Sequence, residues 1–310
     1  MATILITGGS GMIGSALTKE LRRKGHRAVI LTRKKKGNDP DFKEWNVEEG
    51  TIDENAVREA DYIVHLAGAN VAEVRWTDKR KKEILDSRVK SGELLVKALS
   101  SISNKVKAVI SASAIGWYGP DSQVPNRRPF VETDGAHNDF LGQTCVKWEL
   151  AIEPVRQLNK RLVILRTGIV LSNEGGAYAE FKKPLQFGMA TILGSGKQVV
   201  SWIHIDDLVA QYVAAIESEY YSGVYNAVAP QPVSNKEIVL TMAKQRGKFY
   251  IPVRVPAVAL KIALGEMSVE VLKSATVSAE KIQTQGYQFL YPQIGDAVRQ
   301  LEGEGRTAIK

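Results

Sequence analysis

Cysteine and histidine are scarce in this chain of 310 residues, which has one cysteine and four histidines. The single Cys145 excludes a disulfide framework and a cysteine-rich zinc or iron–sulfur site. No two histidines have the spacing of metal ligands, so we expect no metal site. An uninterrupted apolar run of about 18 residues is also missing, and the first apolar run, 3–7, is too short for a signal peptide. We therefore expect a cytoplasmic protein without a membrane partner.

The composition is otherwise ordinary for a globular protein, with 44% apolar and 25% charged residues. A chain of this length predicts about two domains or one elaborated domain. The net charge is +8, but most positive residues, such as those at 79–82, lie in helical stretches that also carry acidic residues. They are not interleaved with aromatic residues along one stripe. We expect solvated helix faces there and no nucleic-acid partner.

Short apolar runs alternate with helical patterns in the first half of the chain, which predicts an α/β fold with a parallel sheet. A glycine-rich stretch follows Leu171, the alternation returns near 202–228, and from Pro230 the chain is helical and punctuated by proline. We predict a core over 1–171, completed by about 200–229, and a smaller, discontinuous domain from 172–199 and 230–310. The expected strands are 2–7, 27–32, 42–47, 62–67, 106–111, 162–167, 202–205 and 224–228, and the clearest later helices are 77–100, 139–159 and 206–217.

Three glycines at intervals of three, Gly8, Gly11 and Gly14, connect the first strand to the first helix. The first allows a tight turn, the second a close approach of backbone to a pyrophosphate, and the third close packing of helix on strand. The helix N-terminus then offers unpaired N–H groups to phosphates. We predict a dinucleotide site here, which also includes Ser10, Met12 and Ile13.

The residue at the end of the second strand discriminates between cofactors. A carboxylate there would bind a ribose 2′-hydroxyl and favour NAD, but this chain has Thr32 and Arg33. A guanidinium can pair with a 2′-phosphate through two hydrogen bonds, so we predict NADP(H). We expect Arg33 alone to make this contact and Lys34, Lys35 and Lys36 to form a solvated loop.

Other cofactor candidates follow the ends of further strands. The end of the third strand should edge the adenine, and the small residues after the fourth strand should let backbone pass under the nicotinamide ribose. The backbone after the 162–167 strand should meet the nicotinamide carboxamide. His65 is expected to be a packed core residue. The candidates are Asn46, Val47, Leu66, Ala67, Gly68, Thr167, Gly168 and Ile169.

These motifs resemble the extended or atypical short-chain dehydrogenases/reductases. The chain is most similar to an epimerase-like family labelled nucleoside-diphosphate-sugar epimerase or cell-division-inhibitor-like, with that family's small C-terminal domain of unknown function. The resemblance implies a Rossmann-type doubly wound parallel sheet, NADP(H) and a substrate pocket between core and C-terminal region. It rests on the segments 8–14, 65–68, 75–77, 86–89, 111–119, 193–198, 201–207, 263–267 and 286–292.

Enzymes of this superfamily use a Tyr-x-x-x-Lys dyad, in which lysine lowers the tyrosine pKa for proton transfer. The matching helix places Leu141 and Cys145 at the two positions. Lys147 lies roughly 200° around the helix from Cys145. We read Cys145 as a small buried helical residue, because a nucleophilic cysteine needs an activating partner.

The catalytic candidates are therefore Ser113, which would orient a substrate oxygen, and Tyr118, which would be the acid in the loop after its strand. Packing beside Trp117 is the alternative for Tyr118. A literal Tyr-x-x-x-Lys at 178–182 lies in the insertion, and we treat it as a chance match.

Four residues are candidates for the substrate side of the site. Gly176 belongs to a glycine pair whose backbone could contact an anion or sugar hydroxyls. Arg88 either pairs with a carboxylate in the core or contacts substrate. His204 could act in acid–base chemistry, and it and Trp202 have structural roles as the alternative. We expect Asp206 to cap the helix that follows.

Two functions fit these observations. The first is an NADP(H)-dependent, epimerase-like oxidoreductase that acts on a polar small molecule such as a nucleotide sugar. The second is a non-catalytic NADP(H)-binding regulator linked to cell division, which the missing dyad favours. The sequence assigns neither a substrate nor an oligomeric state.

Overall fold

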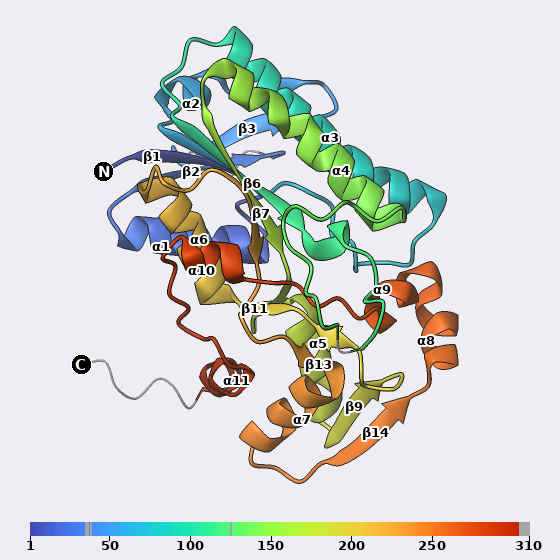
Figure 1. Ribbon diagram of the computed structural model, residues 1–310. Helices are drawn as coiled ribbons and strands as arrows, with labels where there is room; N and C mark the ends of the chain where they lie inside the picture. The colour runs from blue at the N-terminus through green and yellow to red at the C-terminus, as the bar shows by residue number, and fades with distance from the viewer. Residues whose placement is uncertain (35–36, 38, 125, 304–310) are drawn as a thin grey trace, which may run out of the picture.

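The computed structural model describes residues 1–34, 37, 39–124 and 126–303. Lys35 and Lys36 of the basic cluster and the last part of the predicted second domain, 304–310, lie outside the described residues. The centre of the fold is an eight-stranded sheet in the order β12-β7-β6-β5-β1-β2-β3-β4, parallel except for β4 (Figure 1). Its strands are β1 Thr3–Thr7, β2 Arg27–Thr32, β3 Phe42–Asn46, β4 Thr51–Ile52, β5 Tyr62–His65, β6 Ala108–Ala114, β7 Arg161–Thr167 and β12 Gly223–Ala227.

Both faces of this sheet are buried, which explains why its strands are continuous apolar runs. Along β1, Ile4 and Ile6 enter one hydrophobic cluster and Leu5 enters another on the opposite face. Helices α1 (Met12–Arg23) and α6 (Ile205–Glu217) cover the first face, and α3 (Asp78–Ser101) and α4 (Phe140–Ile152) cover the second (Figure 1). The expected Rossmann-type doubly wound α/β fold is confirmed.

Side-chain caps set the starts of the helices over the second face. Asp53, Thr77 and Asp139 each accept a backbone N–H from the first turn of α2 (Glu54–Glu59), α3 and α4. The predicted helix over 139–159 is divided, because α4 ends at Ile152 and a 3₁₀ segment, η2 (Glu153–Leu158), begins with a proline at its first turn. A second 3₁₀ turn, η1 (Ile115–Trp117), follows β6.

A lower lobe has its own hydrophobic cluster, formed where α5 (Gly176–Leu185), α7 (Asn235–Gln245) and α11 (Ile294–Glu302) pack together (Figure 1). Its buried residues come from the predicted insertion and C-terminal region, together with Leu171, Trp202 and Ala229 from the stretches assigned to the core. We keep the domain boundaries as a proposal. The remaining elements are β8 Ile169–Leu171, β9 Met189–Leu193, β10 Val199–Val200, β11 Trp202–His204, β13 Val233–Ser234, β14 Ile251–Val255, α8 Ala257–Leu264, η3 Gly265–Met267, α9 Ser268–Leu272 and α10 Glu280–Thr284.

None of the helices in the described part of the chain is long and apolar enough to cross a membrane.

Candidate functional site

The glycine loop between β1 and α1 is packed so closely that side chains would not fit. A Cβ on Gly8, whose φ is +69°, would lie 2.8 Å from the carbonyl carbon of Leu66. A Cβ on Gly14 would collide with the backbone of Gly8. The N-cap of α1 is Gly11, which has no side-chain cap, so the first-turn N–H groups of α1 are available to an external acceptor. This geometry fits a pyrophosphate.

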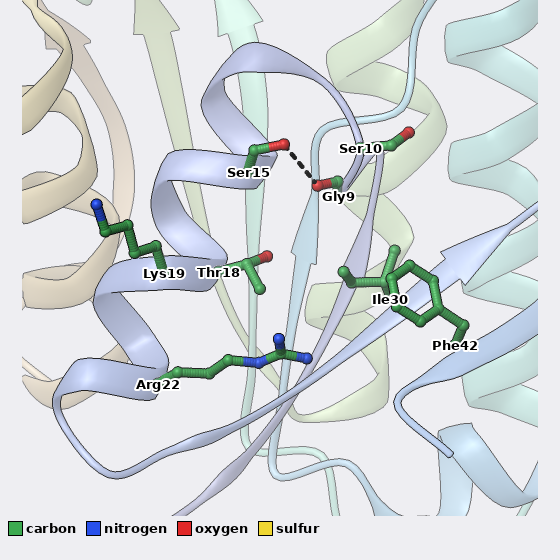
Figure 2. A pocket seen from close by; sticks show the side chains of 8 residues that line it. All are labelled: Gly9, Ser10, Ser15, Thr18, Lys19, Arg22, Ile30 and Phe42. Carbon is green, nitrogen blue, oxygen red and sulfur yellow. Dashed lines mark hydrogen bonds between the residues drawn. The ribbon is translucent and has the colours of Figure 1, made fainter. Parts of the chain in front are cut away.

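A cavity of about 330 Å³ adjoins the loop on the side of the sheet that α1 covers. Figure 2 shows Arg22 extending from α1 toward the strands that carry Ile30 and Phe42, whereas the Lys19 side chain points away from them. The Thr18 hydroxyl in its wall is buried and has no hydrogen-bond partner among the described residues. The cavity therefore joins the phosphate-binding loop to a positively charged region. Its lining is Gly9, Ser10, Ser15, Thr18, Lys19, Arg22, Ile30 and Phe42.

Arg33 follows β2 and is exposed. Thr32 Oγ1 accepts the N–H of Lys34 at 3.4 Å and so shapes the turn. Within the described ranges, no carboxylate forms an ion pair with Arg33, whereas Arg22 pairs with Asp41 at 3.0 Å. With respect to the residues that the structure describes, Arg33 is thus an uncompensated cation at the strand end where the sequence predicts a 2′-phosphate.

The strand-end candidates lie at the same edge of the sheet but differ in their contacts. Thr7 Oγ1 accepts the N–H groups of Leu66 and Ala67, both at 3.1 Å, and fixes the backbone after β5. Asn46 Oδ1 accepts the N–H of Glu48 at 3.1 Å, so this side chain shapes its own turn, and Val47 is partly buried against the core.

After β7, Thr167 is buried and Ile169 is exposed. Gly168 lies against the Ser201 carbonyl, which a Cβ would approach to 2.6 Å. The cofactor contacts of the residues that follow β3, β5 and β7 stay predictions.

His65 is a core residue, as the sequence indicates. It is fully buried, and its ring nitrogens contact the hydroxyls of Thr7 at 2.9 Å and Ser91 at 3.4 Å. Burial, followed by the nearby Arg88 charge, lowers the pKa of His65 to about 4. The ring is therefore neutral near pH 7.

A buried ionic network lies at the carboxyl ends of β6, β7 and β12. Ser113 Oγ donates to Glu149 at 2.6 Å, and Arg166 Nε and Nη2 donate to the same carboxylate at 2.9 Å each. The register places Ser113 beside Arg166, and Arg166 beside Asn226, on neighbouring strands. Because the Ser113 hydroxyl donates to Glu149, it can only accept from a bound ligand.

Sequence reasoning missed the role of Arg166, which is stacked 3.6 Å from the centroid of the Trp117 ring. Its signal was present, since it is the one charged residue inside the buried run Leu162–Thr167. A charge in such a strand requires a partner.

The structure corrects the interpretation of Tyr118. Its side chain is fully buried, stacks on Phe130, and donates a hydrogen bond to Asn226 at 2.7 Å. Burial raises its pKa to about 12, although the Arg166 charge opposes this. The loop after β6 turns the ring into the core, so Tyr118 packs and is not an accessible acid.

The dyad positions hold no proton-transfer pair. Leu141 packs on Gly116, and the Cys145 thiol donates a weak hydrogen bond to the Ala114 carbonyl at 3.6 Å. Burial, assisted by Glu149, raises the pKa of Cys145 to about 12. Lys147 is exposed on the other side of α4, as expected. Cys145 is therefore a buried, protonated thiol.

Two of the four substrate-side candidates are not supported. Trp202 is fully buried and donates to the Gln231 carbonyl at 2.9 Å, and His204 is fully buried with Nε2 3.0 Å from Gln300. His204, rather than Asp206, caps α6, because its Nδ1 accepts the Asp206 N–H. Burial also lowers the His204 pKa. Both side chains hold the lower lobe together.

The other two candidates lie near the cofactor loop. Gly176 begins α5, and a Cβ there would be 3.7 Å from the Met12 side chain. Arg88 reaches the backbone of Ala69, 3.0 Å away, directly after Gly68. The chance match at 178–182 is inside the lower lobe, where Tyr178 is fully buried and donates to Glu302 at 2.7 Å.

The parallel sheet, the tight glycine loop and the uncapped start of α1 define a dinucleotide-binding protein of the Rossmann type. The chain belongs to the NAD-dependent epimerase/dehydratase family, whose pattern matches residues 4–227. Residues 255–301 match a domain of unknown function (DUF1731). The resemblance seen in the sequence is thereby confirmed.

Similar proteins cover almost the whole chain. An epimerase family protein of Mycobacterium bovis is 35% identical over 298 residues, covering 96% of this chain and 96% of its own. One of Staphylococcus aureus is 35% identical over 307 residues, covering 97% and 99%. The crystal structure of the human epimerase family protein SDR39U1 with NADPH has a TM-score of 0.85 at 29% identity, covering 97% of this chain and 99% of its own.

Proposed function

We propose that this protein binds NADP(H) and is an epimerase-like oxidoreductase acting on a polar small molecule such as a nucleotide sugar, without the usual tyrosine–lysine dyad. The observation that carries the cofactor assignment is Arg33, an exposed cation after β2 that has no ion-pair partner among the described residues. The human relative solved with NADPH supports the same cofactor. Membership of the epimerase/dehydratase family supports the class of reaction.

The cofactor, when bound, supplies a hydride donor or acceptor at its nicotinamide ring. Gly8, Gly11 and Gly14 would hold its pyrophosphate at the start of α1, and Arg33 its 2′-phosphate. The candidates Ser10, Met12 and Ile13 on the loop complete this proposal.

Ser113 would orient the substrate by accepting a hydrogen bond from a substrate hydroxyl, because its own proton is donated to Glu149. The Glu149 carboxylate accepts hydrogen bonds from Nε and Nη2 of Arg166 as well as from Ser113, so both of its oxygens are engaged. The network therefore positions Ser113 and does not remove its proton.

The cofactor assignment is tested with the substitution Arg33→Asp. We expect NADPH affinity to fall by roughly 10- to 100-fold, because a charge-assisted phosphate contact is lost and a repulsive carboxylate is added. NADH affinity should be unchanged. Lys97→Asp, an exposed position on α3, makes the same charge change away from the site. Equal NADPH binding by the Arg33 and Lys97 variants would reject the assignment.

The reaction class is tested by following NADPH oxidation at 340 nm with carbonyl compounds and nucleotide sugars. Turnover that Ser113→Ala reduces strongly would support the enzyme. The buried Cys145 and apolar Leu141 at the dyad positions favour the second function, an NADP(H)-binding regulator. Tight NADPH binding with no turnover over a broad panel would select it.

A further inference from the structure

Arg88 lies on the face of α3 that packs against α4. It is one turn after the buried Ile84 and one turn before the buried Gly92. Its Nη1 donates to the carbonyls of Ala69 at 3.0 Å and Ile84 at 2.9 Å, and its Cζ lies 4.9 Å from the centroid of the Trp148 ring. The side chain thus extends from α3 to the backbone that follows β5.

This guanidinium has no counter-ion among the described residues. Two more deeply buried arginines, Arg80 and Arg166, both pair with glutamates. For Arg88, Nη1 alone of the guanidinium nitrogens has an acceptor within the described part of the chain. Burial is the main effect that lowers its pKa to about 10. The side chain is nonetheless only partly buried, and its Nε and Nη2 are not among the buried atoms that lack a partner, so these donors remain accessible to a ligand.

The position of the guanidinium relates it to the missing dyad. A Cβ on Gly68 would lie 3.1 Å from Arg88 Cζ, so Arg88 packs against the glycine expected beneath the nicotinamide ribose. Cys145 and Trp148 lie three residues apart on α4 and face α3. The Arg88 charge is near enough to the Cys145 thiol to lower its pKa, against the stronger effect of burial. Cys145 occupies the position where related enzymes have lysine.

We infer that Arg88 supplies, from α3, the positive charge that related enzymes place on α4 at the position of Cys145, and that it donates hydrogen bonds to the nicotinamide ribose. This inference rests on the proposed binding of NADP(H). Since the charge is unpaired, it also favours the neutral reduced nicotinamide over the cationic oxidised ring. Arg88 is therefore a cofactor-binding residue that sets the preference for NADPH over NADP⁺.

The test is a fluorescence titration with NADPH and a competition titration with NADP⁺. Arg88→Met should raise the NADPH dissociation constant by roughly 10- to 100-fold, the range for a lost charged hydrogen bond. The NADP⁺ constant should rise less, because repulsion is lost as well. Arg88→Lys should retain part of the affinity and the preference. Lys97→Met removes an exposed charge from the same helix and should change neither.

A second variant protects the test against a purely structural effect of Arg88→Met. Adding Cys145→Lys to Arg88→Met returns a positive charge from α4, and we expect most of the NADPH affinity and preference to return. Circular dichroism and urea unfolding establish that each variant is folded.

A folded Arg88→Met protein that binds both cofactors as tightly as the wild type would overturn the inference. The inference would also be overturned if Arg88→Met lost affinity equally for NADPH and NADP⁺, and if neither Arg88→Lys nor the double variant restored any of that affinity. A third outcome separates the inference from the proposed function. If the Arg88 variants bind NADPH as predicted but the wild-type protein oxidises NADPH with none of the substrates tested, the proposed enzyme is rejected and the inference stands.

Discussion

The ion pair between Arg166 and Glu149 should make a large contribution to stability. The two side chains are 3% and 11% exposed, and two hydrogen bonds of 2.9 Å join them. Arg166→Met keeps much of the volume over Trp117 but leaves the Glu149 carboxylate with the Ser113 hydroxyl as its one remaining partner among the described side chains. Loss of one member of a buried pair costs about 3–5 kcal/mol, and we expect Arg166→Met to fall in that range.

Replacing both charged residues should destabilise the protein less than the sum of the two single substitutions. In Arg166→Met/Glu149→Met no buried carboxylate is left without its counter-ion, so its destabilisation should be smaller than the sum of the two single variants by about 1–3 kcal/mol. The exposed pair Arg58–Glu54, with side chains 45% and 64% exposed, is the matched control. Breaking it should cost at most about 0.5 kcal/mol.

The measurement is urea unfolding followed by tryptophan fluorescence and circular dichroism, with the m-values compared between variants. A destabilisation below about 1 kcal/mol for Arg166→Met would refute the reasoning, since it would mean that Glu149 finds other solvation. Strict additivity in the double variant would refute it equally, because the two charges would then not be coupled.

Two further predictions concern buried titratable groups. The pKa of His65 is lowered to about 4 from an unfolded value near 6.5. The neutral ring therefore contributes fully to the stability of the fold above pH 6.5, and this contribution is lost as pH falls toward 4. The free energy of unfolding should decrease across that window by up to about 1.4 kcal/mol per pH unit. His65→Asn should flatten this slope, and a slope of unfolding free energy against pH that the substitution leaves unchanged would contradict the prediction. Because burial raises the Cys145 pKa to about 12, a thiol reagent at pH 8 should modify the native protein at least about 100-fold more slowly than the urea-unfolded chain, and comparable rates would be inconsistent with a buried thiol.

The parallel sheet and the glycine loop could be predicted because their signals are local. A buried strand is a continuous apolar run, and Gly8, Gly11 and Gly14 follow one directly. Two further signals are equally local: Arg33 stands where an acidic residue would favour NAD, and the positions that we predict for the dyad hold Leu141 and Cys145. None of these needed knowledge of which strands are neighbours.

The errors came from side chains whose direction depends on distant packing. Tyr118 is next to the right strand, but its ring turns inward to reach Asn226, more than a hundred residues later. His204 and Trp202 lie in a motif typical of the family, yet both are buried in the lower lobe against the C-terminal region. Their positions in the sequence contain no information about these partners.

The sequence by itself determined the α/β class and the position of the dinucleotide loop, because each depends on residues within a few positions of one another. Only the tertiary structure decided which charges are compensated. It brings Ser113, Glu149 and Arg166 together from three elements, and among the residues that it describes it gives Arg88, beside Gly68, no carboxylate partner. The buried Arg166 must find its partner within a few ångströms in the protein, since its charge is removed from water. The partly exposed Arg88 keeps donors that a ligand can reach.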